Sequence, residues 1–276
     1  MAASTDQRSA ARPNGPRAAA GVHITVRDLT MAYGSFVVMH DLSFTVRRGD
    51  VFIIMGGSGC GKSTLLRHLI GLNEPAKGEI FYDAVNFTTT APQGRQALLR
   101  RFGVLYQGGA LWSSMTLAEN VGIPLGEFTD LNPAEIREIA ALKLALVGLK
   151  GFEDYFPSQI SGGMQKRAGI ARAIALDPEI MFFDEPSSGL DPISSRLIDD
   201  LILDLRDNLG STVIVVTHEL ASILTIGNNS VFLDAEDRTI IARGDPKEML
   251  AHCDIPRVRQ FLTRGDGAAS TARSHG

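Results

Sequence analysis

Residues 56–63 have the types and spacing of a loop that binds phosphate. They read Gly56-Gly57-Ser58-Gly59-Cys60-Gly61-Lys62-Ser63 and fit the pattern G-x-x-x-x-G-K-[ST]. Glycines permit backbone conformations in which successive N–H groups converge on phosphate oxygens, and the positive end of a following helix adds to the attraction. We expect Lys62 to span the β and γ phosphates of a nucleotide, Ser63 to ligate Mg²⁺ and Thr64 to assist at the α-phosphate. A glycine-rich turn without a ligand is the alternative, but a buried strand before the segment and a helix after it are the context that the motif requires.

Cys60 is the residue of this loop that carries nucleophilic chemistry of its own. The positive charge of the loop should lower the pKa of the Cys60 thiol. We therefore expect alkylation of Cys60 to inactivate the protein and ATP to protect it. The alternative is that Cys60 only fills a position where small residues are tolerated.

A pair of carboxylates follows a second apolar run. Residues 180–183 are Ile, Met, Phe and Phe, and Asp184 and Glu185 come directly after them. In doubly wound sheets the carboxyl end of such a strand lies beside the phosphate loop. Asp184 would then hold Mg²⁺ through water, and Glu185 could polarise the water that attacks the γ-phosphate. Acidic residues after a strand are common, so the pair carries weight only together with the loop. The sequence lacks the N-K-x-D motif with which GTPases read the base, which favours ATP.

The elements that must position these residues alternate between strand and helix. Segments 23–29 and 42–46 alternate apolar and polar residues, as half-buried strands do, and 51–55, 180–183 and 212–216 are continuous apolar runs of strands buried on both faces. Helical spacing is found in the remaining patterned segments, 62–71, 133–147, 164–176 and 193–209. We expect Asp191 to cap the last of these helices and Gly210 to end it. The sequence therefore predicts an α/β fold with a mostly parallel core sheet, an antiparallel β layer at the N-terminal side and a helical insertion.

Composition bounds the class of protein. The 276 residues are 44% hydrophobic and 21% charged, which excludes a disordered, collagen-like or disulfide-stapled chain. A net charge of −4 gives no global basic field, so we expect no nucleic-acid partner. Two cysteines form no disulfide framework, and no apolar run approaches the roughly 18 residues of a membrane span. We expect one domain over residues 22–263, with disordered tails over 1–21 and 264–276.

Residues 161–165, Ser161-Gly162-Gly163-Met164-Gln165, decide the family. They resemble the L-S-G-G-Q signature of ATP-binding-cassette (ABC) ATPases, with Ile160 in place of Leu and Met164 between the second glycine and Gln165. A hydroxyl and two glycines at a helix N-terminus would make a second anion site. Taken alone, the segment is equally well explained as a helix cap with flexible glycines. We call residues 161–165 the signature segment.

Other positions of the ABC family match in order. Tyr33 is similar to the aromatic residue that stacks on adenine, and Gln107 to the glutamine that senses the γ-phosphate and Mg²⁺. Asp191 ends a stretch, 187–191, that resembles the loop running between subunits, and His218 resembles the switch histidine. Tyr33 alone could be a surface aromatic, and Asp191 could be only a cap.

The resemblance covers residues 22–250 or so and implies a P-loop NTPase ABC cassette with the signature in a helical subdomain at about 95–172. It implies an ATP hydrolase with Glu185, His218 and Gln107 as catalytic residues and Ser63, Gln107 and Asp184 around Mg²⁺. ATP would lie between the phosphate loop of one cassette and the signature segment of another, so the chain would act as a homodimer. The implied ATP-binding residues are Tyr33, Gly56, Gly57, Ser58, Gly59, Cys60, Gly61, Lys62, Ser63, Thr64, Ser161, Gly162, Gly163, Gln165 and Asp191.

Several stretches are similar to the ATPases of Mla/Mce-type lipid transporters. They are Q-G-G-A-L-W at 107–112 with E-N-V at 119–121, the segments around the signature and Asp184, and P-R-V-R-Q-F-L at 256–262. This resemblance implies phospholipid transport through separate permease subunits, an Mce-domain lipid-binding protein and a STAS-domain protein. It places the chain at the cytoplasmic face of the bacterial inner membrane, peripheral through the permease.

The same stretch suggests where a permease would bind. The resemblance implies that this stretch receives the permease coupling helix, with Leu111, Trp112 and Met115 as the apolar contacts and core packing as the alternative. A cassette of an importer for a polar solute, such as an amino acid or ion, is the alternative function. A soluble ABC ATPase of translation or DNA repair would usually carry two cassettes, a long coiled coil or zinc cysteines, none of which is present here.

Overall fold

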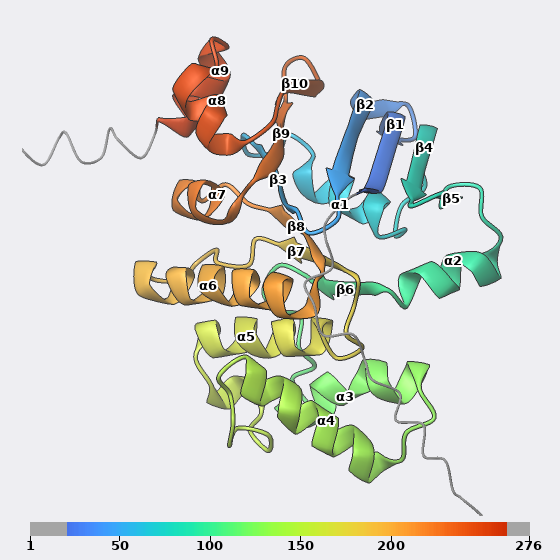
Figure 1. Ribbon diagram of the computed structural model, residues 1–276, viewed down its shortest axis with the longest axis vertical. Helices are drawn as coiled ribbons and strands as arrows, with labels where there is room; N and C mark the ends of the chain where they lie inside the picture. Colours follow the sequence, from blue (N-terminus) through green and yellow to red (C-terminus); the bar gives the residue numbers. More distant parts are fainter. Residues whose placement is uncertain (1–20, 264–276) are drawn as a thin grey trace, which may run out of the picture.

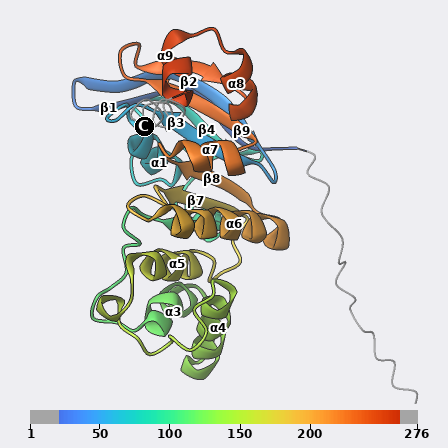
Figure 2. The same ribbon diagram turned by 90° about the vertical axis from the view of Figure 1, so that its left-hand side faces the viewer.

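The computed structural model describes residues 21–263, and they stack in layers along one axis (Figure 1). An antiparallel sheet and a mixed sheet lie toward one end, and three helices lie at the other (Figures 1 and 2). The two tails expected to be disordered, 1–21 and 264–276, lie outside the described residues apart from Gly21.

The core sheet has six strands in the order β10-β9-β3-β8-β7-β6, and all neighbours are parallel except β10 and β9. Its strands are β3 (Val51–Gly56), β6 (Phe102–Leu105), β7 (Ile180–Asp184), β8 (Thr212–Val216), β9 (Asn229–Asp234) and β10 (Thr239–Arg243). Every residue of β3, β7 and β8 is buried, as the continuous apolar runs predicted. The expected mostly parallel sheet is confirmed.

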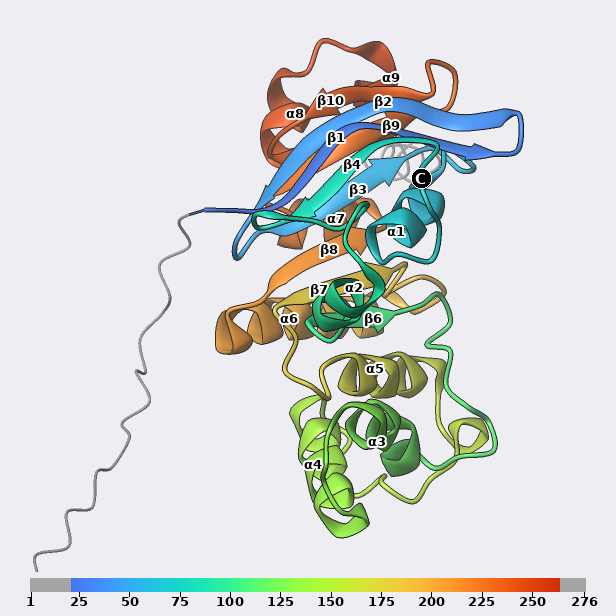
Figure 3. The same cartoon turned by 90° about the vertical axis from the view of Figure 1, so that its right-hand side faces the viewer.

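The second sheet is antiparallel, with the order β2-β1-β4-β5. It contains β1 (Val22–Tyr33), β2 (Phe36–Arg47), β4 (Lys77–Tyr82) and β5 (Val85–Asn86). One apolar cluster joins this sheet to the core sheet and includes Val26, Phe52 and Leu65, the last from helix α1 (Lys62–Leu69). Figure 3 shows β1, β2 and β4 above α1 on this side of the molecule. The expected antiparallel layer is therefore confirmed.

A second apolar cluster covers the other face of the core sheet. The alternate residues Ile53 and Met55 of β3 belong to it, whereas Phe52 and Ile54 face the first cluster. The remaining helices are α2 (Pro92–Leu99), α3 (Leu117–Phe128), α4 (Pro133–Leu146), α5 (Gly162–Ala173), α6 (Pro192–Leu209), α7 (Leu220–Ile226), α8 (Pro246–His252) and α9 (Pro256–Leu262). A 3₁₀ turn, η1 (Pro157–Gln159), precedes α5. None of the helices between residues 21 and 263 has both the length and the apolar character that a membrane crossing needs.

The helical part of the molecule begins later than the sequence suggested. It consists of α3, α4 and α5, which pack on one another below the core sheet (Figure 1). The expected start at about residue 95 is wrong, because β6 lies within that range and pairs with β7 in the core sheet. A strand of four residues gives too short a pattern to be read from sequence.

Helix α6 begins and ends as predicted. The Asp191 carboxylate accepts hydrogen bonds from the backbone N–H groups of Ile193 and Ser194, both at 3.0 Å. Gly210 ends the helix in the left-handed conformation with φ 65°. The cap fixes where the loop after β7 turns into α6.

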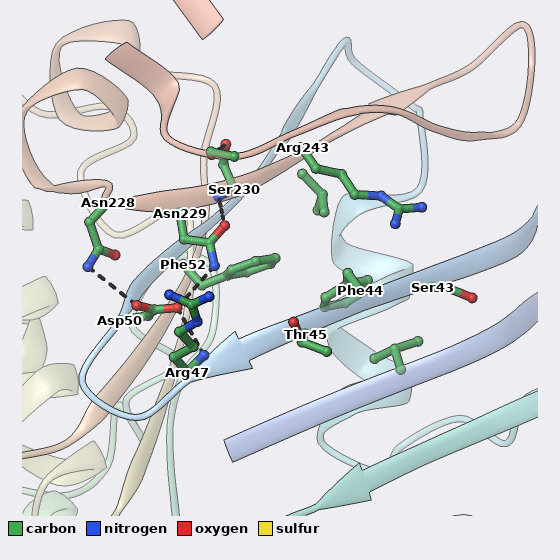
Figure 4. Close-up of a pocket in the computed structure, with 13 residues that line it drawn as sticks. Ser43, Phe44, Thr45, Arg47, Asp50, Phe52, Asn228, Asn229, Ser230 and Arg243 are labelled. Atoms are coloured by element: carbon green, nitrogen blue, oxygen red, sulfur yellow. Dashed lines mark hydrogen bonds between the residues drawn. The ribbon is translucent and has the colours of Figure 1, made fainter. Parts of the chain in front are cut away.

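A groove of about 700 Å³ lies between the two sheets (Figure 4). Asp50 lies at one end, buried, and accepts hydrogen bonds from the Arg47 backbone N–H at 2.9 Å and from the side-chain amides of Asn229 at 3.0 Å and Asn228 at 3.4 Å. We call this the inter-sheet groove. Its buried carboxylate has partners on both oxygens.

Candidate nucleotide-binding site

The phosphate loop connects β3 to α1 and lines a cleft of about 630 Å³. Side chains from distant segments complete the lining, namely Val38, Gln107, Glu185, His218, Leu220 and Phe261. Gly61, at the start of α1, has φ 92°, and Gly56 comes so close to β9 that a Cβ on it would lie 2.3 Å from the Leu233 carbonyl oxygen. The loop therefore depends on glycine at these two positions.

Lys62 curls over the loop that precedes it. Its ammonium donates to the carbonyl oxygens of Gly57 at 2.8 Å and Gly56 at 3.0 Å, and the side chain is largely buried. A cation held there, at the N-terminus of α1, sits where phosphate oxygens would meet the loop. The placement agrees with the role expected for Lys62.

Ser63 and Asp184 meet at the end of β7. The Ser63 hydroxyl donates to Asp184 Oδ1 at 3.1 Å. Burial raises the pKa of Asp184, and the Ser63 hydrogen bond opposes that rise. A hydroxyl and a carboxylate are hard oxygen donors of the kind that Mg²⁺ prefers, so this pair fits the ion that the sequence implied.

Glu185 is held in an unusual conformation. Its φ of 52° is left-handed, which costs about 1–2 kcal/mol for a residue with a Cβ. Its backbone N–H donates to the Val216 carbonyl at 2.8 Å, and His218 Nδ1 lies 2.7 Å from Oε1. Oε2 is buried without a hydrogen-bond partner among residues 21–263. Backbone strain and an unsatisfied buried oxygen both favour a functional position.

The Cys60 thiol faces inward and not toward the cleft. The side chain is 2% exposed, and its sulfur lies 4.0 Å from the Lys62 ammonium. Burial raises the pKa of Cys60, and the nearby Lys62 charge only partly opposes this. The expected lowering of the Cys60 pKa is therefore wrong, because loss of water outweighs the positive charge of the loop.

Gln107 follows β6 and lies in the cleft on an exposed loop. Arg172 of α5 supports this loop by donating to the carbonyl oxygens of Ala110 at 2.8 Å and Gly109 at 3.0 Å. Tyr33 lies outside the cleft lining, half exposed at the end of β1, and its hydroxyl accepts from the Asn73 amide at 3.1 Å. Gln107 is thus brought to the phosphate loop, and Tyr33 stands beside α1.

The signature segment does not reach the phosphate loop of its own chain. Ser161 caps α5 by accepting from the Met164 backbone N–H at 3.3 Å, and Gly162 is exposed. Gln165 points back to the turn before this helix, because its amide donates to the Pro157 carbonyl of η1 at 2.9 Å. Asp191 is likewise exposed outside the cleft. The residues that the resemblance assigns to ATP binding therefore lie in two separate places on one chain.

Sequence reasoning missed Lys166 and Phe261. Lys166, on α5, donates to the carbonyl oxygen of Glu185 at 2.7 Å. The one signal for it was a charged residue before the apolar stretch 168–171 of that helix. Phe261 enters the cleft lining from α9, and no local pattern could place it beside a loop two hundred residues earlier in the chain.

Comparison with known proteins agrees with this geometry. Residues 39–188 match the family model described as ABC transporter. The chain is 42% identical over 242 residues to the probable ribonucleotide transport ATP-binding protein mkl of Mycobacterium tuberculosis, covering 88% of this chain and 67% of that protein. It is 39% identical over 246 residues to the intermembrane phospholipid transport system ATP-binding protein MlaF of Escherichia coli, covering 89% of each.

A solved structure has the same fold. The dimeric ATP-binding cassette MJ0796, in a post-hydrolysis state bound to ADP and Pi, superposes with a TM-score of 0.73 at 29% identity. The match covers 80% of this chain and 98% of that one.

Proposed function

This chain belongs to the ABC transporter family and is the ATP-hydrolysing subunit of such a transporter, and we propose that it drives phospholipid transport through separate membrane permease subunits. The observation that carries the ATPase half of the proposal is that Lys62, Ser63, Glu185 and His218 line one cleft and that Asp184 is hydrogen-bonded to Ser63 beside it. These residues come from three segments that are far apart in the sequence.

In the proposed reaction a water molecule attacks the γ-phosphorus of ATP, the bond to the bridging oxygen of ADP breaks, and inorganic phosphate leaves. Glu185 takes the proton of that water, and His218, 2.7 Å from Oε1, keeps the carboxylate aimed. Lys62 and the loop N–H groups hold the phosphates. Mg²⁺, held by Ser63 and Asp184, would neutralise the charge that develops on the phosphate oxygens.

The separation of the signature segment from the phosphate loop supports a homodimer. The signature segment and Asp191 lie away from the phosphate loop of the same chain, on an exposed helix start and an exposed cap. A second copy would bring its Ser161, Gly162 and Gly163 to the ATP held by the first. Closure on ATP and opening after hydrolysis would then supply the movement that a permease needs.

The loop after Gln107 supports the permease contact. Trp112 is 61% exposed, so packing in the core does not explain this side chain, whereas Leu111 and Met115 are half-buried beside it. Asn120 braces the loop from α3: its amide donates to the Trp112 and Met115 carbonyls at 3.1 Å, and its oxygen accepts from the Trp112 N–H at 2.7 Å. A rigidly held, exposed aromatic residue is a good anchor for a partner helix.

The cargo proposal is supported by the relatives. MlaF is matched over 89% of both chains and is named for phospholipid transport, whereas mkl is named for ribonucleotide transport and is matched over 67% of its length. An Mce-domain lipid-binding protein and a STAS-domain protein would accompany the permease at the cytoplasmic face of the inner membrane. Purification of the tagged chain in detergent should recover a permease, an Mce-domain protein and phospholipid, and recovery of a solute-binding protein in their place would favour the polar-solute importer.

The ATPase half is tested by Glu185→Gln. The variant should bind ATP as the wild type does, hydrolyse it at least about 100-fold more slowly and accumulate as an ATP-bound dimer in size-exclusion chromatography. Glu219→Gln is the matched control, because Glu219 is an exposed carboxylate 3.9 Å from the other nitrogen of His218. Near wild-type turnover of Glu185→Gln would remove Glu185 as the base.

A further inference from the structure

Helix α5 makes contacts with three parts of the site. Its start carries the signature segment, its middle reaches Glu185 through Lys166, and its last turn reaches the loop after Gln107 through Arg172. Beyond the helix start, the contacts are made by Lys166, Gly169 and Arg172, which are three residues apart in turn and therefore lie along one side of the helix.

Lys166 is a buried cation whose partner is a backbone carbonyl. The side chain is 7% exposed, and its ammonium donates to the Glu185 oxygen at 2.7 Å. Lysine is seldom buried unless it is paired, because its charge loses the solvation of water. Burial lowers the pKa of Lys166, and the charges of Glu185 and Asp184 oppose this. Burial and this hydrogen bond therefore hold the Lys166 side chain in one position.

The carbonyl that Lys166 binds belongs to the strained residue of the site. Glu185 is anchored at its backbone N–H by the Val216 carbonyl of β8, and its own carbonyl accepts from Lys166 of α5 at 2.7 Å and from the Ser188 N–H at 3.3 Å. A left-handed conformation at a glutamate persists only where the surroundings hold it. The direction of the Glu185 side chain therefore depends on where α5 lies.

Two further contacts of α5, from Gly169 and Arg172, reach the loop that follows Gln107. Gly169 lies so close to Gly109 that a Cβ on Gly169 would be 3.2 Å from the Gly109 Cα atom. Arg172 binds the Gly109 and Ala110 carbonyls. A shift of α5 would thus move both the Gln107 loop and the Glu185 backbone.

We propose that Lys166 is a positioning residue for hydrolysis: it fixes the Glu185 backbone from α5, so that the helix carrying the signature segment sets the aim of the carboxylate. This rests on the proposed function, and it concerns only the residue that holds the base. A movement of α5 on engagement of the signature segment by the ATP of a second chain would then reach Glu185 through the hydrogen bond that Lys166 donates.

The test is Lys166→Met in the full-length chain. The methionine fills the same space without the donor. It should lower kcat for ATP hydrolysis at least 10-fold while the Kd for ATP stays within threefold of wild type. Lys166→Arg, which keeps a charged donor, should recover kcat to within about threefold of wild type. If Lys166→Met fails to fold, as judged by thermal melting, Lys166→Leu, which also lacks a donor, replaces it with the same expectation.

Arg167→Met is the matched control. Arg167 is the next residue of α5 and also donates to carbonyls, those of Val147 and Gly148 at 3.3 and 3.4 Å, which lie in the helical part. Its removal should leave kcat within threefold. An equal loss in Arg167→Met, a loss that arginine does not recover at position 166, or wild-type kcat in Lys166→Met would overturn the proposal.

A double variant separates this proposal from the assignment of the base. If Lys166 acts through Glu185, Lys166→Met in the Glu185→Gln background should slow single-turnover hydrolysis by less than twofold beyond Glu185→Gln alone. A full additional 10-fold loss would show that Lys166 acts elsewhere. Rapid hydrolysis by Glu185→Gln itself would instead overturn the proposed function.

Discussion

The nucleotide cleft and the inter-sheet groove are similar in volume, about 630 and 700 Å³, and each contains a buried carboxylate. Asp50 in the groove accepts hydrogen bonds on both oxygens and joins β2, β3 and the start of β9. Glu185 in the cleft has one oxygen without a partner among the described residues, and a strained backbone. The volume of a cleft therefore does not identify the site. The site is identified by groups that the fold leaves unsatisfied and strained.

The cations of the two clefts also differ. Lys62 is pulled over the phosphate loop by two carbonyl oxygens, at the positive end of a helix. Arg243 extends along the inter-sheet groove from β10, at an exposed position (Figure 4). The lysine of the nucleotide cleft is thus fixed at a helix N-terminus, which is where a polyphosphate would bind.

The largest effect is expected from a comparison of two variants, each of which removes one cation from one of the clefts. Lys62→Met should weaken ATP binding at least about 100-fold, because charge-assisted bonds to the phosphates are lost in a partly buried site. Arg243→Met should leave the Kd within about twofold. Equilibrium binding of a fluorescent ATP analogue measures both. Equal losses in the two variants would break the distinction between the clefts.

A middle effect is expected at Asp50. Asp50→Asn replaces one accepting oxygen by an NH₂ group, which would face the N–H donors of its neighbours and leave hydrogen bonds unmade. It should therefore lower the free energy of unfolding by about 1–3 kcal/mol in urea denaturation. The kcat of the folded variant should remain that of the wild type, because the groove has no part in hydrolysis. A loss of kcat with unchanged stability would assign the groove a role in the reaction.

The smallest effect is expected at Asp199. A substitution there tests whether a buried oxygen without a hydrogen-bond partner is enough to identify a functional group. Asp199 of α6 is buried outside both clefts, accepts from the Ser222 hydroxyl at 2.9 Å and has no partner on Oδ1 among residues 21–263. Burial raises the pKa of Asp199 to about 6 from 3.8, although the Ser222 bond opposes this; Asp200 and Glu219 add to the rise, and Arg196 reduces it.

A raised acid pKa means that the folded state binds its proton more tightly than the unfolded state. This contribution to stability is therefore full below pH 3.8 and is lost as pH rises toward 6. Asp199→Asn should accordingly stabilise the protein by about 1–2 kcal/mol at pH 7.5 and by almost nothing at pH 4. Urea denaturation at both pH values measures this, with exposed Asp200→Asn as the control. Loss of kcat in Asp199→Asn would show that the buried oxygen matters to the reaction.

Local patterns made the loop, the buried strands and the cap of α6 predictable from sequence. The run 212–216 was predicted with the bounds of β8, and the helix expected over 193–209 is α6 from Pro192 to Leu209. Each depends on neighbours in the chain, where glycine spacing, apolar runs and an Asp-Pro cap have direct local causes.

What the sequence could not predict depends on segments meeting in space. The pKa of Cys60 required knowing how β9 and Lys62 enclose the thiol. Lys166 gained meaning only when α5 was placed beside Glu185. The direction of the Gln165 side chain was not predictable until its hydrogen bond to the Pro157 carbonyl was known. None of these contacts produces a periodic pattern in the sequence.

The left-handed backbone of Glu185 also limits which residues can occupy that position. Glycine would relieve the strain, and aspartate or asparagine would enter this conformation more easily, but none carries a carboxylate as far from the backbone. The chain thus keeps a residue that suits its conformation poorly and gives up stability at one point. Selection for stability alone would remove the glutamate, and the proposed role of Glu185 as the base supplies a reason for keeping it.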